Sequence, residues 1–226
     1  MAKINILGIT LTDCSLKEAL SMADEYVSNG ALNTILYVTA PMLILAGRDD
    51  GEKERIEAVD LTMCGDADIL RVARIESRNR IYEVENHIFL KEFLRRLMYG
   101  RRSIYLLTDS EENEKSLRNI IQEFQRGIFI AGSRVIGEEE DADETANIIN
   151  DVAPTVIISR MASGKQEEWM CRLKPVINAE VWMGIPEDMK LGEHYLTFRQ
   201  KLVNIIYKKI FHTRINRYNG ESDKNG

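Results

Sequence analysis

The segment most suggestive of chemistry in this sequence is SGKQE at residues 163–167, a glycine turn placed where a helix is expected to begin. Such a turn presents free backbone N–H groups and the positive end of a helix dipole to an anion. Lys165 adds a positive charge, so the segment suits a phosphate-bearing ligand. The structural alternative is that Ser163 caps the helix, Glu167 complements its dipole and Trp169 packs into the core.

Four further segments carry polar groups directly after apolar runs. They are Thr39-Ala40-Pro41, Cys64-Gly65-Asp66, Thr108-Asp109 and the stretch from Gly184 to Asp188. In open parallel sheets, ligands bind beyond the carboxyl ends of the strands. We therefore expect hydroxyl, carboxylate, amide and ammonium groups to gather along one sheet edge, where they suit a polar ligand that carries phosphate.

Metal chemistry has weak support. Asp66-Ala67-Asp68 and Asp141-Ala142-Asp143 both place two carboxylates at the spacing that can bridge Mg²⁺ to a diphosphate. With 36 acidic residues such triplets arise by chance, and the three histidines are dispersed along the chain. We expect no metal ion and no cofactor.

Strand-like and helix-like segments alternate along the chain. The runs expected to form strands are residues 4–11, 34–38, 60–63, 103–107, 128–131, 155–159 and 181–183. Helical signals lie between them, including a capping box at Ser15 and Glu18 and a helical apolar spacing over residues 86–98. Parallel neighbours need such crossovers, so we predict a Rossmann-like α/β fold with a mainly parallel sheet and helices on both faces.

A basic segment is the one compositional break. Residues 194–220 contain six Lys and Arg residues and no Asp or Glu, although the net charge of the chain is −6. Residues 198–211 predict an amphipathic helix, which suits an anionic membrane surface, packing on the body of the protein, or pairing with another subunit. We therefore divide the chain into an α/β domain at residues 1–193 and a basic appendage at residues 194–226.

Composition places the protein among soluble globular chains. Hydrophobic residues make up 44% and charged residues 29% of the 226 residues, and no linker interrupts them. The start resembles no signal peptide, and no apolar run is long enough to span a membrane. The three cysteines lack CxxC spacing, which fits reduced thiols. We expect a cytoplasmic protein, peripheral on the inner face of the plasma membrane if the appendage binds lipid, and no nucleic-acid partner.

Four segments resemble, in order and spacing, the signatures of the WecG/TagA/CpsF glycosyltransferases. They read NILGITLTDCSLKEAL, VTAPMLILA, VDLTMCGD and GKQEEWM, and the resemblance runs from about Ile4 to Tyr218. It implies metal-independent, inverting transfer of N-acetylmannosamine or a related sugar. The implied donor is a UDP-sugar, and the implied acceptor is undecaprenyl-diphosphate-linked N-acetylglucosamine at the membrane, in cell-surface polysaccharide synthesis.

The resemblance also implies roles for individual residues. Thr39, Gln166 and Asp188 match site positions of the family. A hydroxyl and an amide can fix a sugar or diphosphate, and the Asp188 carboxylate can accept a hydrogen bond from uracil N3–H. Arg214 and Arg217 match the basic C-terminal signature, whose arginines close over the diphosphate. Together with Lys165 and Glu167, these residues form the expected substrate-binding set.

Several family positions are changed in this chain. The catalytic base of the family is the aspartate of an Asp-Gly pair, which here reads Gly65-Asp66. The family's Thr-Pro-Asn has become Thr39-Ala40-Pro41, and a double glycine has become Thr108-Asp109. Two hypotheses follow: an active glycosyltransferase that uses Asp66 as its base, or a catalytically silent relative that binds a nucleotide sugar or serves as a partner subunit. A homo-oligomer or a complex with another glycosyltransferase fits either hypothesis.

Overall fold

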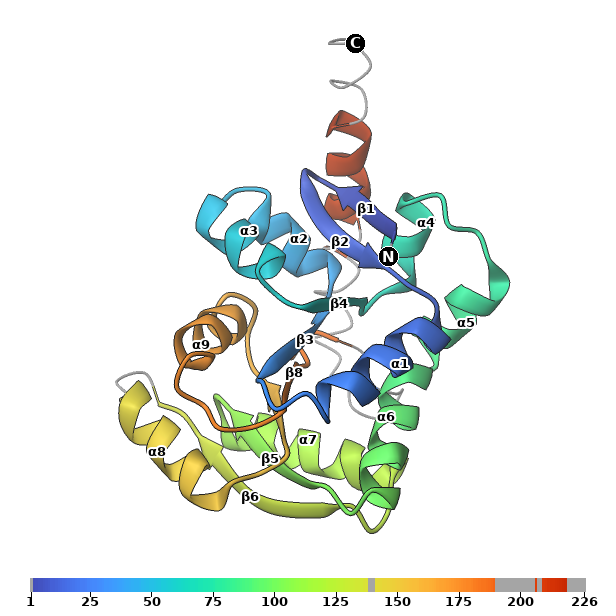
Figure 1. The fold of residues 1–226 in the computed structure, drawn as a ribbon. Helices are drawn as coiled ribbons and strands as arrows, with labels where there is room; N and C mark the ends of the chain where they lie inside the picture. Colours follow the sequence, from blue (N-terminus) through green and yellow to red (C-terminus); the bar gives the residue numbers. More distant parts are fainter. Residues whose placement is uncertain (1, 138–140, 190–205, 207–208, 219–226) are drawn as a thin grey trace.

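The computed structural model describes residues 2–137, 141–189, 206 and 209–218, and it has an α/β architecture (Figure 1). The strands are β1 (Ala2–Ile6), β2 (Ile9–Asp13), β3 (Asn33–Val38), β4 (Leu61–Cys64), β5 (Ser103–Thr108), β6 (Phe129–Val135), β7 (Val156–Arg160) and β8 (Val181–Gly184). The helices are α1 (Leu16–Tyr26), α2 (Ala40–Ala46), α3 (Asp50–Glu57), α4 (Ala67–Val72), α5 (Arg78–Glu85), α6 (Ile88–Tyr99), α7 (Glu111–Phe124), α8 (Ala142–Val152) and α9 (Lys165–Leu173). Residues 209–218 are also helical.

The main sheet has six strands in the order β4-β3-β8-β7-β5-β6, and every pairing is parallel. One core, on the face covered by α2, α3, α8 and α9, contains Leu36 and Val38 of β3. The other core, on the face covered by α1, α6 and α7, contains Ile35 and Tyr37 of the same strand. Successive strand residues point to opposite faces, so β3 supplies both cores. The predicted Rossmann-like, mainly parallel fold is confirmed.

The amino-terminal strand prediction was wrong. Residues 4–11 form no single strand; β1 and β2 pair with each other as an antiparallel hairpin outside the main sheet. The turn residues Leu7 and Gly8 both have positive φ, at 54° and 81°, as a tight two-residue hairpin turn requires. The side chain of Asn5 accepts a hydrogen bond from the Gly8 N–H at 3.1 Å.

The local helix signals were read correctly. Ser15 Oγ accepts from the Glu18 N–H at 3.3 Å, and Glu18 Oε2 accepts from the Ser15 N–H at 2.8 Å, which completes the capping box of α1. Pro41 lies in the first turn of α2, where its missing N–H costs nothing. These signals fix where the chain leaves β2 and β3.

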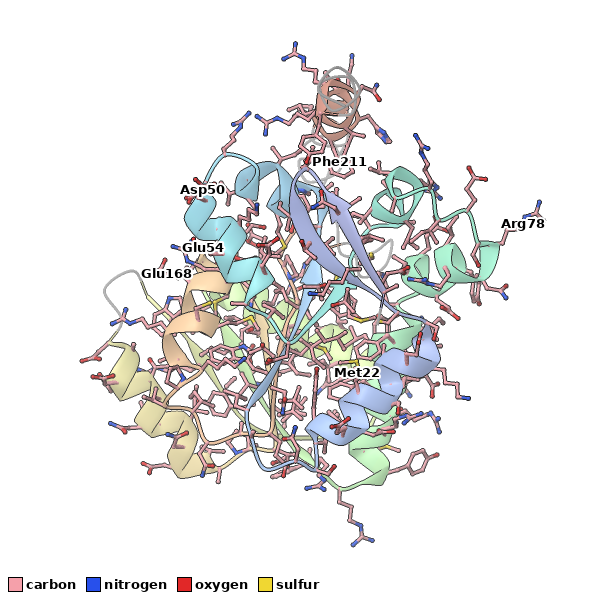
Figure 2. The ribbon with its side chains drawn as sticks, turned by 45° about the horizontal axis from the view of Figure 1, so that its top comes forward. Met22, Asp50, Glu54, Arg78, Glu168 and Phe211 are labelled. Atoms are coloured by element: carbon pink, nitrogen blue, oxygen red, sulfur yellow. The ribbon has the colours of Figure 1, made fainter. Side chains whose placement is uncertain are left out.

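The described part of the appendage packs on the body. Phe211 is fully buried and Ile215 nearly so, and both join the core on the α2 face. Arg214 Nη1 donates to the Ile44 carbonyl of α2 at 3.1 Å. Figure 2 shows Phe211 where this helix meets the rest of the molecule. Most of the helix predicted over residues 198–211 lies outside the described residues, and none of the described helices is long and apolar enough to cross a membrane.

A partly buried polar network joins the carboxyl end of α9 to the amino ends of β3 and β4. Asp60 Oδ2 accepts from the Thr34 N–H at 2.7 Å and from Thr34 Oγ1 at 2.8 Å, and Lys174 Nζ lies 2.6 Å from the same oxygen. Burial raises the pKa of Asp60, but the hydrogen bonds from Lys174 and Thr34 outweigh it, so the pKa is lowered. The ionised carboxylate therefore stabilises the fold above the ordinary Asp range, and this stabilisation is lost as pH falls through the lowered pKa.

We expect Asp60→Asn to reduce the free energy of unfolding at pH 7 by about 1–3 kcal/mol, because it removes a charged acceptor from three donors. The difference in free energy of unfolding between the variant and wild type should shrink in acid, where the wild-type carboxyl is protonated. Urea denaturation at pH 7 and pH 2 measures both values, with exposed Asp151→Asn as the control. An equal difference at both pH values would exclude the ionised carboxylate as the cause.

Candidate functional site

The carboxyl ends of β3 and β8 bring two predicted site residues together. Thr39 follows β3 and Asp188 lies four residues after β8, and these strands are neighbours in the sheet. Thr39 Oγ1 donates to Asp188 Oδ2 at 2.8 Å, although 149 residues separate them. The other carboxylate oxygen, Asp188 Oδ1, is buried and has no hydrogen-bond partner within the described residues. A buried carboxylate oxygen of this kind can accept a hydrogen bond from a ligand.

The electrostatics of Asp188 follow from its neighbours. The pKa of Asp188 is raised to about 6, because burial and the charge of Asp66 outweigh the Thr39 hydrogen bond and the Arg160 charge, which lower it. At pH 7 the carboxylate is therefore mainly anionic. Asp188 Oδ1 therefore favours a ligand group that donates an N–H or O–H, and it disfavours a phosphate.

Asp66 lies at the next strand end. It is the N-cap residue of α4, and its Oδ2 accepts from the Ala40 N–H at 3.1 Å, so its carboxylate meets the β3–α2 junction beside Thr39. Asp66 also lines an open cavity of about 190 Å³ together with Gly65, Asp68, Arg71, Glu85 and His87, among others. A polar cavity with a carboxylate on its wall is a suitable place for a hydroxyl that must lose a proton.

A second, smaller cavity of about 40 Å³ shares Val84 and His87 with the first. Its wall is more apolar and includes Tyr37, Met63 and Phe89. The two cavities lie beside the end of β4. Within the described residues, no group of three or more His, Cys, Asp or Glu side chains is arranged to hold a metal ion.

The turn before α9 has a backbone conformation that favours glycine. Gly164 has φ 90°, and its N–H donates to Glu167 Oε2 at 2.6 Å. Gln166 is fully buried, and its side-chain amide donates to Ser159 Oγ, which also accepts from Trp182 Nε1 at 2.7 Å. The carbonyl oxygen Gln166 Oε1 is buried without a hydrogen-bond partner in the described residues. Gln166 therefore sits at the ends of β7 and β8, close to the predicted site.

Lys165 and Glu167 make intramolecular contacts. Lys165 Nζ donates to the Ile136 carbonyl at 3.3 Å, toward the segment that follows β6. Glu167 is 1% exposed, and burial together with the neighbouring Glu52 raises its pKa to about 8. The helix-capping role proposed as the structural alternative thus falls to Glu167 and Gly164, and Ser163 is not the cap. Substrate contact by Lys165 and Glu167 stays a prediction.

The two arginines of the appendage lie on the helix at residues 209–218. Arg214 contacts α2 through the Ile44 carbonyl, and Arg217 is exposed. Partial burial and the nearby charges of Arg48 and Arg217 lower the pKa of Arg214. Three cations therefore lie near one another beside α2, the helix that begins at Thr39.

Arg160 and Glu52 are buried charged residues near the site that sequence reasoning did not identify. Arg160 is the last residue of β7, is 6% exposed and contacts the turn that carries Asp188. A charged residue closing the apolar run VIIS was the available signal. Glu52 is 1% exposed although it lies in a stretch of alternating charges, which is typical of a solvated helix. No local signal marks it.

Comparison with known protein families gives a match over most of the chain. Residues 4–187 match the sequence model of the glycosyl transferase WecG/TagA/CpsF family, which is most of the 226 residues. The matched region contains Thr39, Asp66 and Gln166 and ends just before Asp188. No curated protein sequence matches the chain significantly.

Proposed function

This chain belongs to the WecG/TagA/CpsF glycosyltransferase family, and we propose that it transfers N-acetylmannosamine or a related sugar from a UDP donor to a lipid-diphosphate-linked N-acetylglucosamine. The observation that carries the proposal is the junction of three strand ends. There, Asp188 offers a buried oxygen without a partner in the described residues, Thr39 fixes its other oxygen, and Asp66 lines a neighbouring cavity. Such a junction can separate a nucleotide subsite from an acceptor subsite.

The charges of the site residues suggest where each part of the UDP donor binds. The carboxylates of Asp188 and Asp66 repel a diphosphate, so the Asp188 oxygen suits the uracil N3–H. The amino end of α9 is already capped by the Glu167 carboxyl, which competes with an anion. We therefore place the diphosphate toward Arg214 and Arg217, where guanidinium groups also stabilise the negative charge on departing UDP.

Asp66 acts as the general base in this proposal. It takes the proton of the acceptor hydroxyl while that oxygen attacks the anomeric carbon. The bond from the anomeric carbon to the UDP oxygen breaks at the same time, UDP leaves, and the configuration at the carbon inverts. The cavity beside Asp66 is where the acceptor sugar would lie.

The appendage suits a lipid-linked acceptor. Its described helix exposes Lys209 and Arg217 together with Ile210 and Tyr218, a mixture that favours an anionic membrane surface. We propose that the protein works peripherally on the inner face of the plasma membrane, in cell-surface polysaccharide synthesis, alone, as a homo-oligomer or with another glycosyltransferase. Failure to bind anionic liposomes at low salt would exclude the membrane contact.

Calorimetric titration with UDP, without metal and then with Mg²⁺, tests the donor subsite. We expect metal-independent binding that weakens about 10- to 100-fold in Asp188→Asn, because the charged acceptor for the uracil N–H is lost. Exposed Asp151→Asn should bind like wild type. Absence of binding under both conditions contradicts the proposal.

A catalytically silent family member that binds a nucleotide sugar, or that serves as a partner subunit, is the second candidate. One observation favours it: a Cβ atom at Gly65 would lie 3.0 Å from Thr39 Cγ2 and 3.0 Å from the Val38 carbonyl oxygen. The position at which the family carries its base therefore has little room for a side chain here. Binding of UDP without any transfer would support this candidate.

A further inference from the structure

Arg160 is a buried cation directly beneath the candidate donor site. It ends β7 and is 6% exposed. Its Nη1 donates to the Pro186 carbonyl at 3.1 Å, and its Nη2 donates to the Glu187 carbonyl at 2.6 Å and, more weakly, to the Met189 carbonyl at 3.5 Å. These three carbonyls flank Asp188 on both sides, so one guanidinium holds the turn at residues 185–189.

The surroundings of Arg160 are anionic. The carboxylates of Asp188, Glu187 and Asp109 favour its charged form, while burial lowers its pKa to about 10, so it stays charged at pH 7. Asp109 is itself fixed, because its Oδ2 accepts from the Ala162 N–H at 2.9 Å and its Oδ1 accepts from Asn113 Nδ2 at 2.7 Å. Arg160 therefore stands between the carboxylates that follow β5 and β8.

A buried charge is costly when an apolar side chain could fill the same space. In addition, the Arg160 Nε–H is buried without a hydrogen-bond partner in the described part of the chain. An arginine that only supported the fold would contribute little to stability here, because its charge is buried and its Nε–H has no partner in the described residues. The positive charge of Arg160 does, however, favour the ionised form of the Asp188 carboxyl.

We propose that Arg160 is a positioning residue for the nucleotide: its guanidinium fixes the turn at residues 185–189 and holds the Asp188 carboxylate, against Thr39, ready to accept the N–H of a pyrimidine base. The inference rests on the proposed function. Three groups act on Asp188: Thr39 from the β3–α2 junction, Asp66 from the start of α4, and Arg160 from β7. Arg160 is the one positive charge among them, and Asp66 opposes it.

The test is UDP titration of wild type, Arg160→Met and Arg160→Lys across pH 5 to 9. In wild type, affinity falls in acid as Asp188 takes up a proton. Loss of the positive charge raises the pKa of a carboxyl, so in Arg160→Met the midpoint should move to higher pH. Binding at pH 7 should weaken about tenfold, mainly because the turn at residues 185–189 also loses its hydrogen bonds from Arg160. Arg160→Lys keeps the charge and loses the planar fork, so it should restore the midpoint but only part of the affinity.

An unchanged midpoint in folded Arg160→Met overturns the inference, because a merely structural role lowers affinity equally at every pH. If Arg160→Met does not fold, Arg160→Gln, which keeps hydrogen-bonding groups and loses the charge, replaces it: a higher midpoint supports positioning, and the wild-type midpoint overturns it. If wild type binds no UDP, the proposed function fails, and the inference is then read from the ¹³C carboxyl titration of Asp188 in the free protein. A higher Asp188 midpoint in the folded neutral variant than in wild type supports positioning, and an equal midpoint overturns it.

Discussion

Asp66→Asn is expected to lower the rate of sugar transfer by about 10²- to 10⁴-fold while UDP binding persists, because asparagine cannot take the proton of the acceptor hydroxyl. The substitution keeps an oxygen that can accept from the Ala40 N–H, so the start of α4 should stay intact. Turnover is measured with a UDP-N-acetylmannosamine donor and a lipid-diphosphate acceptor, and binding is measured by calorimetry. Full turnover in the variant would exclude Asp66 as the base.

Asp68→Asn is the matched control for this prediction. Asp68 lines the same cavity as Asp66, and its carboxylate is paired with Arg71 Nη1 at 2.8 Å. We expect its replacement to change the rate by less than about threefold, because a partly exposed ion pair contributes little. A loss as large as that of Asp66→Asn would mean that the charge of the cavity matters and not one carboxylate.

The reversed order of Gly65 and Asp66 has a structural explanation. The backbone at residue 65 donates to the Val38 carbonyl at 2.7 Å, which brings it too close to Val38 and Thr39 for a side chain. The carboxylate of residue 66 faces the β3–α2 junction, where its Oδ2 accepts from the Ala40 N–H. An active enzyme would thus have the carboxylate of Asp66, one residue after Gly65, beside Thr39.

The fold was predictable because its determinants are local. Alternating apolar runs and helix caps were enough to predict a parallel sheet, and the rule that ligands meet strand ends brought Thr39 and Asp188 together across 149 residues. The hairpin of β1 and β2 was missed because Leu7-Gly8 interrupts no apolar pattern and is not among the strongest turn signals.

The polar contacts of the site were less predictable, because they depend on which elements pack together. Arg160 meets a turn 26 residues later in the chain, and Glu52 meets Glu167 only because α3 lies against α9. Periodicity places a residue on a face of a helix or strand but says nothing about which charge lies opposite. Such pairs follow from tertiary structure alone.

The pair of Glu52 and Glu167 leads to the second large effect, on stability. Both side chains are 1% exposed, and Glu52 Oε2 is held by Arg55 Nη1 at 2.8 Å. Burial and the Glu52 charge raise the pKa of Glu167 to about 8 from 4.5. A raised carboxyl pKa means that the folded state binds the proton more tightly. Its stabilising contribution is complete below about pH 4.5 and is lost as pH rises through about 8.

Glu167→Gln imitates the protonated carboxyl and keeps an acceptor for the Gly164 N–H. At pH 9 we expect the variant to be more stable than wild type by about 2 kcal/mol or more, and at pH 5 nearly equal to it. Urea denaturation at the two pH values measures this, with exposed Glu168→Gln, on the same helix in Figure 2, as the control. If the variant is less stable by the same amount at both pH values, the charged carboxylate is the better helix cap. Glu52 and Glu167 would then both be ionised in the folded protein, and the turn that leads into Gln166 would depend on the negative charge of Glu167.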